Sequence, residues 1–344
     1  MERILVRLPN WLGDLLMARP LLHALRRAHP GARVVAVGQA AHLDLLAHDG
    51  VIDEAHPWPH EGARRTALAR ELRARPLDAA LVLPPSFSSA WFAWRAGARR
   101  RIGYAHDLRG ALLTRALPRP PRGELHLSRE YLALGLALGG VCETEKGPAS
   151  ADHPDASATP PLVPPPWAMP RAEAALAGAV VPGAAERPIA LLAPAARYGP
   201  AKRWPASRFA AVGRVLAGRG YQLLVCGVAS ERAECEAVAV AGGAVSLAGA
   251  TDLAAQAALC ARAALALCND SGLAHLSAAV GTPTVTIFGS TSSAWSAPLG
   301  PRVRVIQQAP VCAPCFQRTC RIGYRCLEAV GVERVVRVCL EAAA

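Results

Sequence analysis

The sequence of 344 residues contains few aromatic side chains and no long apolar run. Phe, Trp and Tyr make up 5% of the chain, whereas hydrophobic residues as a whole make up 52%. This composition suits Ala-, Leu- and Val-rich helices packed on buried strands, and it excludes a disordered chain. The longest apolar candidate, Tyr131–Cys142, is shorter than the roughly 18 residues of a membrane span. Since the first residues enter a strand pattern without signal-peptide architecture, we expect a cytoplasmic protein.

The chain also lacks a balance of charge. Thirty-eight Lys and Arg residues exceed 26 Asp and Glu residues, which gives a formal net charge of +12. Such a charge indicates an anionic partner or surface: nucleic acid, a phosphorylated substrate or acidic lipid. The sequence contains no nucleic-acid recognition motif and little interleaving of basic with aromatic residues. We therefore expect no nucleic-acid partner.

Cysteine, in contrast, is plentiful, with ten in the chain. In a reducing compartment most of them should be free thiols, and several lie in apolar runs as core residues. A C-x2-C-x4-C-x5-C pattern is formed near the C-terminus by Cys312, Cys315, Cys320 and Cys326. Four thiolates at this spacing could bind a structural zinc ion, and the alternative is a loop of packed thiols.

Strand-like and helix-like segments alternate in the first half of the chain. The predicted strands are Arg3–Leu8, Arg33–Val37 and Ala79–Leu83, and the predicted helices are Leu15–Ala28 and a segment around His42–His48. Parallel βα units give this pattern. Pro20 should kink the first helix or mark its first turn.

A second βα series predicts a second domain. Its strands are Ile189–Ala193, Gln222–Cys226, Ala244–Leu247, Ala264–Cys268 and Thr284–Phe288. Between the two series the composition shifts to Pro, Ala, Ser and Gly, which is typical of a linker. We predict an N-terminal domain over 1–150, a linker over 151–187, a C-terminal domain over 188–330 and a C-terminal helix over 331–344. The fold class is therefore α/β, with two Rossmann-like parallel-sheet domains.

Residues 269–275, Asn-Asp-Ser-Gly-Leu-Ala-His, follow an apolar strand and open a helix. Backbone N–H groups at a helix N-terminus attract anions. Asp270, Ser271 and His275 would add hydrogen-bonding side chains there, so a nucleotide or sugar phosphate is the natural ligand. The alternative is an ordinary helix cap, with Asp270 or Ser271 bonding the N–H groups of the helix and His275 simply packed.

The first predicted βα junction, Leu8–Asp14, brings a carboxylate to the carboxyl edge of a sheet. Gly13 would let the backbone approach a ligand closely, and Asp14 could take a proton from a hydroxyl. The alternative is that Asp14 only caps the following helix. The junction lacks the G-x-G-x-x-G pattern, which argues against a Rossmann dehydrogenase.

Two basic segments could bind anions. The loop after Ile189–Ala193 carries Arg197, Lys202 and Arg203, which could offset the charge of a diphosphate as it leaves, or could form a solvated basic loop. In the first half, Arg95 and Arg99–Arg101 follow Ser86. A phosphate-bearing acceptor or an acidic membrane surface would suit this stretch, although a charge run is also common on any solvated face.

In combination these motifs resemble the ADP-heptose:lipopolysaccharide heptosyltransferases. They appear in family order and span nearly the whole chain. The resemblance rests on Pro9–Asp14, Leu83–Ala90, Arg101–Tyr104, Gly199–Pro205, Asn269–His275, and Cys312–Phe316 with Cys320 and Cys326.

The resemblance implies a GT-B fold, two Rossmann-like domains facing a central cleft, and catalysis without an obligatory metal or other cofactor. Asp14 would be the general base that deprotonates the acceptor hydroxyl as it attacks the anomeric carbon with inversion. Lys202 would hold the diphosphate of ADP-heptose, and ADP would leave. The expected substrate-binding residues are Gly13, Ser86, Arg101, Arg197, Arg203, Asn269, Asp270, Ser271, Gly272 and His275.

The same resemblance implies an acceptor held by the N-terminal domain. This acceptor would be an inner-core oligosaccharide on lipid A that already carries one heptose. Because lipid A is anchored in the membrane, the resemblance also implies peripheral contact of the protein with the inner leaflet of the inner membrane. One departure is that Gly323–Cys326 reads Gly-Tyr-Arg-Cys where the family has a Gly-His-His-x-Cys form.

The same motifs are compatible with other functions. A relative acting on the heptose-free acceptor, or using another ADP-sugar, would share most of these motifs. A non-catalytic nucleotide-sugar-binding protein would not need Asp14 in addition to Lys202 and Asp270, because binding alone requires no base.

Overall fold

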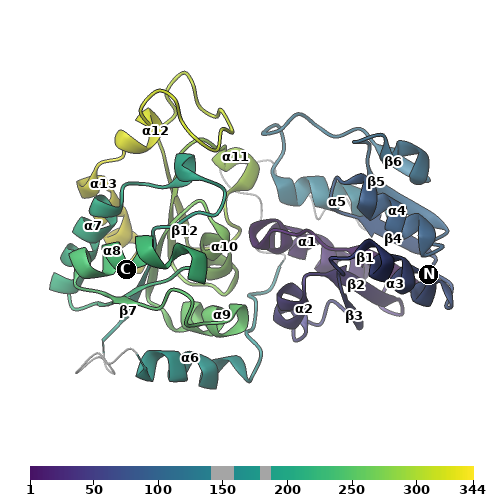
Figure 1. The fold of residues 1–344 in the computed structure, drawn as a ribbon, viewed down its shortest axis with the longest axis horizontal. Coiled ribbons are helices and arrows are strands. Elements are labelled where there is room, and N and C mark those ends of the chain that lie inside the picture. Colours follow the sequence, from purple (N-terminus) through teal and green to yellow (C-terminus); the bar gives the residue numbers. More distant parts are fainter. Residues whose placement is uncertain (141–158, 179–186) are drawn as a thin grey trace. The chain divides into compact units, whose positions relative to one another are not determined.

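Two six-stranded parallel sheets, each covered by helices, form the protein (Figure 1). The computed structural model describes residues 1–140, 159–178 and 187–344. The chain divides into two units, Met1–Pro160 and Pro161–Ala344. The α/β class predicted from the sequence, with two parallel-sheet domains, is confirmed.

The sheet of the first unit has the strand order β3-β2-β1-β4-β5-β6. Its strands are β1 (Arg3–Arg7), β2 (Arg33–Gly38), β3 (Glu54–Pro57), β4 (Ala79–Val82), β5 (Arg100–Tyr104) and β6 (Arg115–Leu117). Its helices are α1 (Leu12–Ala28), α2 (Ala40–Leu46), α3 (Gly62–Arg73), α4 (Phe87–Arg95) and α5 (Leu127–Leu138). The chain builds outward from β1 to β3 and then returns to the other side of β1 with β4. Ligands of open parallel sheets bind outside the carboxyl ends of strands at such a reversal, here β1 and β4.

The second sheet repeats this arrangement with the order β12-β11-β10-β7-β8-β9. Its strands are β7 (Ile189–Ala193), β8 (Gln222–Val225), β9 (Val245–Ser246), β10 (Leu265–Asn269), β11 (Thr284–Phe288) and β12 (Val303–Gln307). The longer helices are α6 (Ala168–Ala177), α7 (Ala206–Gly218), α8 (Arg232–Gly242), α9 (Leu253–Arg262), α10 (Gly272–Ala279) and α13 (Val332–Ala343), and α11 (Ser293–Ser296) and α12 (Arg325–Glu328) are single turns. The strand order reverses between β7 and β10, so the loops that follow these two strands meet at one edge.

Two details differ from the sequence predictions. Pro20 lies in the middle of α1, which begins at Leu12, so it does not mark the first turn. Residues 161–178, inside the predicted linker, belong to the second unit. There α6 packs on α9, and Arg171 pairs with Asp252 at 2.6 Å. The rest of the linker prediction lies largely outside the described residues. No helix in the described ranges is long and apolar enough to cross a membrane.

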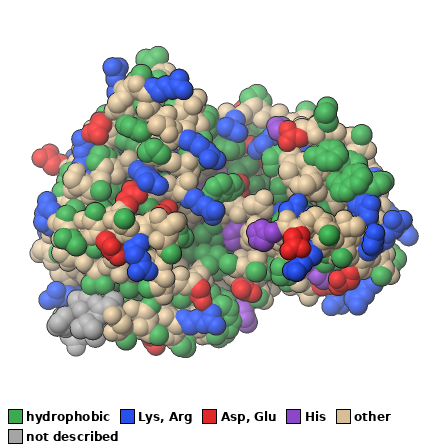
Figure 2. Space-filling model, viewed as in Figure 1, with side chains coloured by type: hydrophobic (Ala, Val, Ile, Leu, Met, Phe, Trp, Pro, Cys, Tyr) green, Lys and Arg blue, Asp and Glu red, His purple; other side chains and the backbone are tan. Residues whose placement is uncertain are grey.

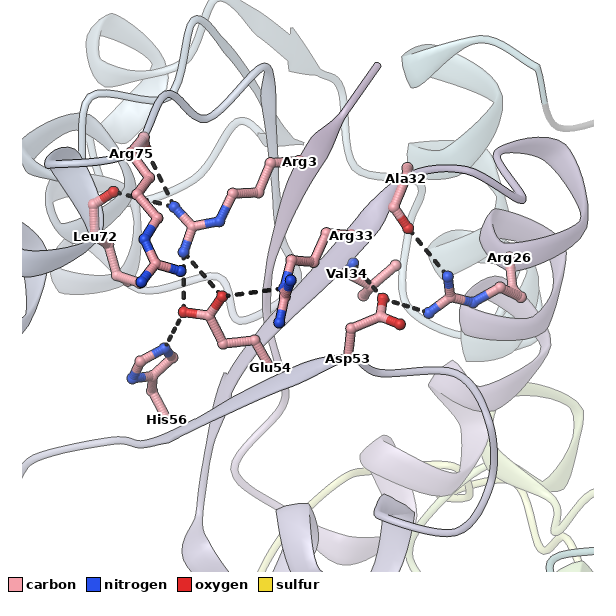
Figure 3. A network of polar contacts seen from close by, with 10 residues as sticks. All are labelled: Arg3, Arg26, Ala32, Arg33, Val34, Asp53, Glu54, His56, Leu72 and Arg75. Atoms are coloured by element: carbon pink, nitrogen blue, oxygen red, sulfur yellow. Dashed lines mark hydrogen bonds and ion pairs between the residues drawn. The ribbon is translucent and has the colours of Figure 1, made fainter.

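A polar network fixes the edge strand β3 to the rest of the first sheet (Figure 3). Glu54 accepts two hydrogen bonds from the buried Arg3 guanidinium, at 2.9 and 3.0 Å, and one contact of 2.8 Å from His56. Arg3 also donates to the carbonyl oxygens of Leu72 and Arg75, so it ties the end of α3 to the sheet. Partial burial disfavours the charged form of Glu54, but the hydrogen bonds from His56 and Arg3 outweigh it and lower the carboxyl pKa.

We expect Glu54→Gln to lower the stability of the first unit at pH 7 by roughly 1–3 kcal/mol, because it leaves the Arg3 charge partly buried and unpaired. Since the pKa of Glu54 is depressed in the folded state, its stabilisation is full above the unfolded pKa of about 4.3 and is lost as the pH falls through the folded pKa. Urea midpoints of the wild type and the variant should therefore converge at low pH. Glu61→Gln, which removes the exposed pair with Arg64, should shift the midpoint little. Equal effects of the two substitutions would contradict this role of Glu54.

Candidate functional site

Three strand ends of the second unit converge on Asp270. The Asp270 carboxylate, 3% exposed, pairs with Lys202 Nζ at 2.5 Å and accepts a hydrogen bond from the Thr291 hydroxyl at 2.5 Å. Lys202 lies on the loop after β7, Asp270 follows β10, and Thr291 follows β11. The structure thus brings together Lys202 and Asp270, as the sequence predicted, and adds Thr291. Thr291 is not among the residues predicted from the sequence, although the Gly-Ser-Thr turn after Thr284–Phe288 is a signal.

The residues that adjoin Asp270 and Thr291 in the chain carry buried hydroxyls without partners in the described part of the structure. Ser271 is the N-cap residue of α10, yet its side chain makes no capping bond. The Ser271 Oγ and the Ser290 Oγ are buried and have no hydrogen-bond partner among the described residues. Leaving a buried hydroxyl unpaired costs free energy, which a polar ligand would recover. The capping alternative is therefore wrong for Ser271, and the Asp270 carboxylate is engaged by Lys202 and Thr291. Gly272 opens α10, and His275 is buried one turn later.

Asn269 has a positioning role in this structure. Its Oδ1 accepts a hydrogen bond from the backbone N–H of Trp204 at 3.0 Å, and its Nδ2 donates to the carbonyl oxygen of Pro194. The fully buried side chain therefore joins the end of β10 to both ends of the loop that carries Lys202. A direct contact of Asn269 with substrate stays a prediction.

Two of the three basic residues on the loop after β7 pair with different carboxylates. Arg203 pairs with Glu234 of α8 at 2.9 Å and donates to the carbonyl oxygen of Ala196. Arg197 is exposed. Lys202 pairs with Asp270 whereas Arg203 pairs with Glu234, so the structure distinguishes these two cations, and the role of Arg197 in substrate binding stays a prediction.

The cysteine-containing loop is hydrogen-bonded to the loop that carries Lys202. The carbonyl oxygen of Arg318 accepts a hydrogen bond from the N–H of Ala201 at 3.0 Å, and the Tyr198 hydroxyl donates to the carbonyl oxygen of Phe316 at 2.5 Å. Gly199 adopts φ +149°, and a Cβ there would lie 2.5 Å from the carbonyl oxygen of Arg318. This close approach leaves no room for a Cβ, so the position requires glycine.

The four cysteines of that loop are spread from surface to core. Cys312 and Cys315 are exposed, Cys320 is partly exposed and Cys326 is buried. The Cys320 sulfur accepts hydrogen bonds from the N–H groups of Ile322 and Tyr324, which lower the thiol pKa. Within the described part of the chain no three His, Cys, Asp or Glu side chains are placed to hold a metal ion. As folded here, the loop does not fit the predicted zinc site. We therefore assign no step of the chemistry to a metal, and the zinc content of the purified protein tests the prediction.

In the first unit, Asp14 lies at the reversal point of the sheet. It occupies the first turn of α1, directly after Gly13, and is half-buried. The N-cap residue is Trp11, and its side chain makes no capping bond. The carboxylate lies near Tyr131 of α5: burial raises the pKa of Tyr131 well above its usual value, and the charge of Asp14 adds to this rise.

Arg7, which is not among the residues predicted from the sequence, supports the loop that leads to Asp14. Its guanidinium is buried, donates to Asn10 Oδ1 at 2.7 Å, and stacks 3.9 Å from the ring centre of Trp58. Burial, with repulsion from Arg65, lowers the pKa of Arg7 to about 9. A buried arginine with these partners fixes the end of β1 and the turn beyond it.

Ser86 is the N-cap residue of α4, on the turn that follows β4 beside β1, and its side chain makes no capping bond. Its hydroxyl lies 2.9 Å from the Ser89 hydroxyl, and the buried Arg109 donates to the carbonyl oxygen of Pro84 in the same turn. Arg101 points elsewhere, since its guanidinium donates to the carbonyl oxygens of Leu112 and Ala98 at 2.7 and 2.6 Å. The structure gives Arg101 a structural role, and its contact with an acceptor stays a prediction.

Comparisons with known proteins agree with this geometry. The family model described as glycosyltransferase family 9 (heptosyltransferase) matches residues 65–325. The chain is 31% identical over 316 residues to lipopolysaccharide heptosyltransferase 2 of Salmonella typhimurium, covering 89% of this chain and 88% of that protein. It is 30% identical to the protein of the same name from Escherichia coli K12, with the same coverage. The solved structure of E. coli ADP-heptose lps heptosyltransferase II superposes with a TM-score of 0.80 at 27% identity, covering 100% of this chain and 98% of the other.

Proposed function

This chain belongs to glycosyltransferase family 9, the heptosyltransferases, and on that premise we propose that it transfers heptose from ADP-heptose to the first heptose of the lipopolysaccharide inner core. The chain is a glycosyltransferase, and two relatives that match over most of their length are named lipopolysaccharide heptosyltransferase 2. The observation in this structure that carries the proposal is the Lys202–Asp270 pair, with the unpartnered hydroxyls of Ser271 and Ser290 beside it.

The second unit binds the donor in this proposal. The N–H groups at the start of α10 and the ammonium group of Lys202 hold the diphosphate of ADP-heptose. As the bond between the anomeric carbon and the diphosphate oxygen breaks, negative charge grows on the departing ADP, and these donors stabilise it. Asp270 and Thr291 fix the position of the Lys202 ammonium, so little reorganisation is needed during the reaction.

The first unit binds the acceptor and supplies the base. Asp14 accepts the proton of the acceptor hydroxyl while the hydroxyl oxygen attacks the anomeric carbon from the face opposite ADP, which inverts the configuration. No cofactor takes part in this reaction. Because the acceptor is anchored in lipid A, the protein works at the cytoplasmic face of the inner membrane, in peripheral contact with the inner leaflet.

The experiment that tests this function measures ADP release from ADP-heptose by purified protein. The two acceptors are Kdo-lipid A cores that carry either no heptose or one heptose, and a reaction without acceptor corrects for hydrolysis. We expect release only with the one-heptose acceptor. Release only with the heptose-free acceptor would contradict the proposal and would show that the protein transfers the first heptose instead. No release with either acceptor, despite measurable ADP-heptose binding, would contradict the proposed acceptor.

A further inference from the structure

Helix α4 exposes three aromatic side chains on one face. Phe87, Trp91 and Trp94 are 46%, 40% and 45% exposed, and their spacing of four and three residues places them on the same side of the helix. Their rings form a row, with centroid distances of 6.2 Å between Phe87 and Trp91 and 4.9 Å between Trp91 and Trp94. The opposite face, which includes Ala90 and Phe92, is buried in the core of the first unit. This row is unusual in a chain with 5% aromatic residues.

Arginines border the aromatic row. The Arg95 guanidinium lies 6.0 Å from the ring centre of Trp91. Arg73, at the end of α3, lies against the turn that ends α4, since its Cγ is 3.1 Å from the position of a Cβ on Gly97. Among the described residues neither Arg73 nor Arg95 forms an ion pair with a carboxylate. Figure 2 shows apolar side chains and basic side chains side by side over α4. We call Phe87, Trp91, Trp94, Arg73 and Arg95 the α4 surface.

We propose that the α4 surface docks the protein on an anionic lipid bilayer. Tryptophan rings are stable at the level of lipid headgroups, where one side is apolar and the indole N–H remains hydrated. Uncompensated arginines beside them attract anionic headgroups. A second copy of this chain is a poorer fit, because it carries the same net charge of +12 and the same arginines.

The position of α4 at the carboxyl edge of the first sheet relates lipid docking to acceptor binding. The helix begins directly after Ser86, at the carboxyl end of β4, and β4 is the neighbour of β1, whose loop leads to Asp14. A bilayer held by the α4 surface would keep a lipid-anchored acceptor close to that edge of the sheet. The identity of the acceptor rests on the proposed function, whereas the binding to lipid is measured without donor or acceptor.

Sedimentation of the full chain with vesicles tests the proposal. The vesicles contain phosphatidylcholine alone or with phosphatidylglycerol, and the variants are Trp91→Ala with Trp94→Ala, and Arg73→Gln with Arg95→Gln. Trp167→Ala is the matched control, because Trp167 is also exposed and also has an arginine over its ring, but that arginine pairs with Asp252 on the second unit.

We expect binding that requires phosphatidylglycerol and weakens with salt. The tryptophan variant should bind about tenfold more weakly or worse, and the arginine variant about 25-fold more weakly, from roughly fivefold for each arginine. The control should bind like the wild type. On a deacylated, soluble acceptor both double variants should retain wild-type turnover, whereas on acceptor embedded in vesicles their turnover should fall.

Other results would overturn the proposal. Wild-type protein that fails to bind phosphatidylglycerol vesicles, or double variants that bind as tightly as Trp167→Ala, would contradict lipid docking even if ADP release proceeds normally. Light scattering that shows a wild-type dimer lost in the tryptophan variant would assign the α4 surface to self-association. Absence of ADP release with intact vesicle binding would instead count against the proposed acceptor alone.

Discussion

Asp14→Asn is expected to reduce turnover by about 10²–10⁴-fold while leaving the affinity for ADP-heptose nearly unchanged. The amide keeps the size and shape of the side chain but cannot accept the proton of the acceptor hydroxyl. Asp14 lies in the first unit, in the first turn of α1, whereas the proposed donor site is built from loops of the second unit. The substitution therefore removes the base without touching the groups that hold the diphosphate.

Single-turnover ADP release and calorimetric titration with ADP-heptose measure the two effects separately. Asp44→Asn is a suitable control, because Asp44 is an exposed carboxylate on α2 of the same unit and should have no effect on either measurement. A large loss of donor affinity in Asp14→Asn, with turnover reduced only in proportion, would show that Asp14 is a binding residue and not the base.

Lys202→Ala is expected to weaken ADP-heptose binding and slow transfer together. Its ammonium group faces the diphosphate before the bond breaks and faces a larger negative charge as ADP departs. A hydrogen bond to a charged group is worth enough to raise the donor Kd by roughly 10–100-fold, and loss of a charge-stabilising donor lowers kcat by about 10²–10³-fold. The measurements are donor titration and steady-state kinetics with saturating acceptor.

The ion pair with Asp270 complicates this variant, because removal of Lys202 leaves a buried carboxylate whose remaining side-chain partner among the described residues is Thr291. Lys202→Ala combined with Asp270→Asn avoids that unpaired charge, so its thermal stability should recover without recovery of donor binding. Arg203→Gln is the matched control on the same loop: Arg203 pairs with Glu234, and we expect a small change in Kd. If Lys202→Ala lowers only the melting temperature, the phosphate-binding role is wrong.

Much of the fold could be predicted because its signals are local. Buried parallel strands are continuous apolar runs, and the segments chosen for β1, β2, β4, β7, β8, β10 and β11 agree with the structure to within a residue or two. Strand β5 was not recognised: Arg100 and Arg101 made it look like a basic surface stretch. Its extended form depends on pairing with β4 and β6, which no local pattern encodes. Pro20 does not mark the first turn of α1, because the helix begins at Leu12 and runs through it, and the alternative that Pro20 kinks the helix stays a prediction.

For the candidate site, the sequence by itself determined which turns follow strands and open helices, and therefore that Asp14, Lys202 and the Asp270 turn lie at carboxyl ends of parallel strands. It did not determine which side chains meet. Lys202 and Arg203 are adjacent and both cationic, yet one pairs with Asp270 and the other with Glu234. Only the tertiary structure decided this. The strand order places β10 on one side of β7, and it places β8, which α8 follows in the chain, on the other side. Contacts between residues 31 and 68 positions apart are set by that packing, and not by the residue types alone.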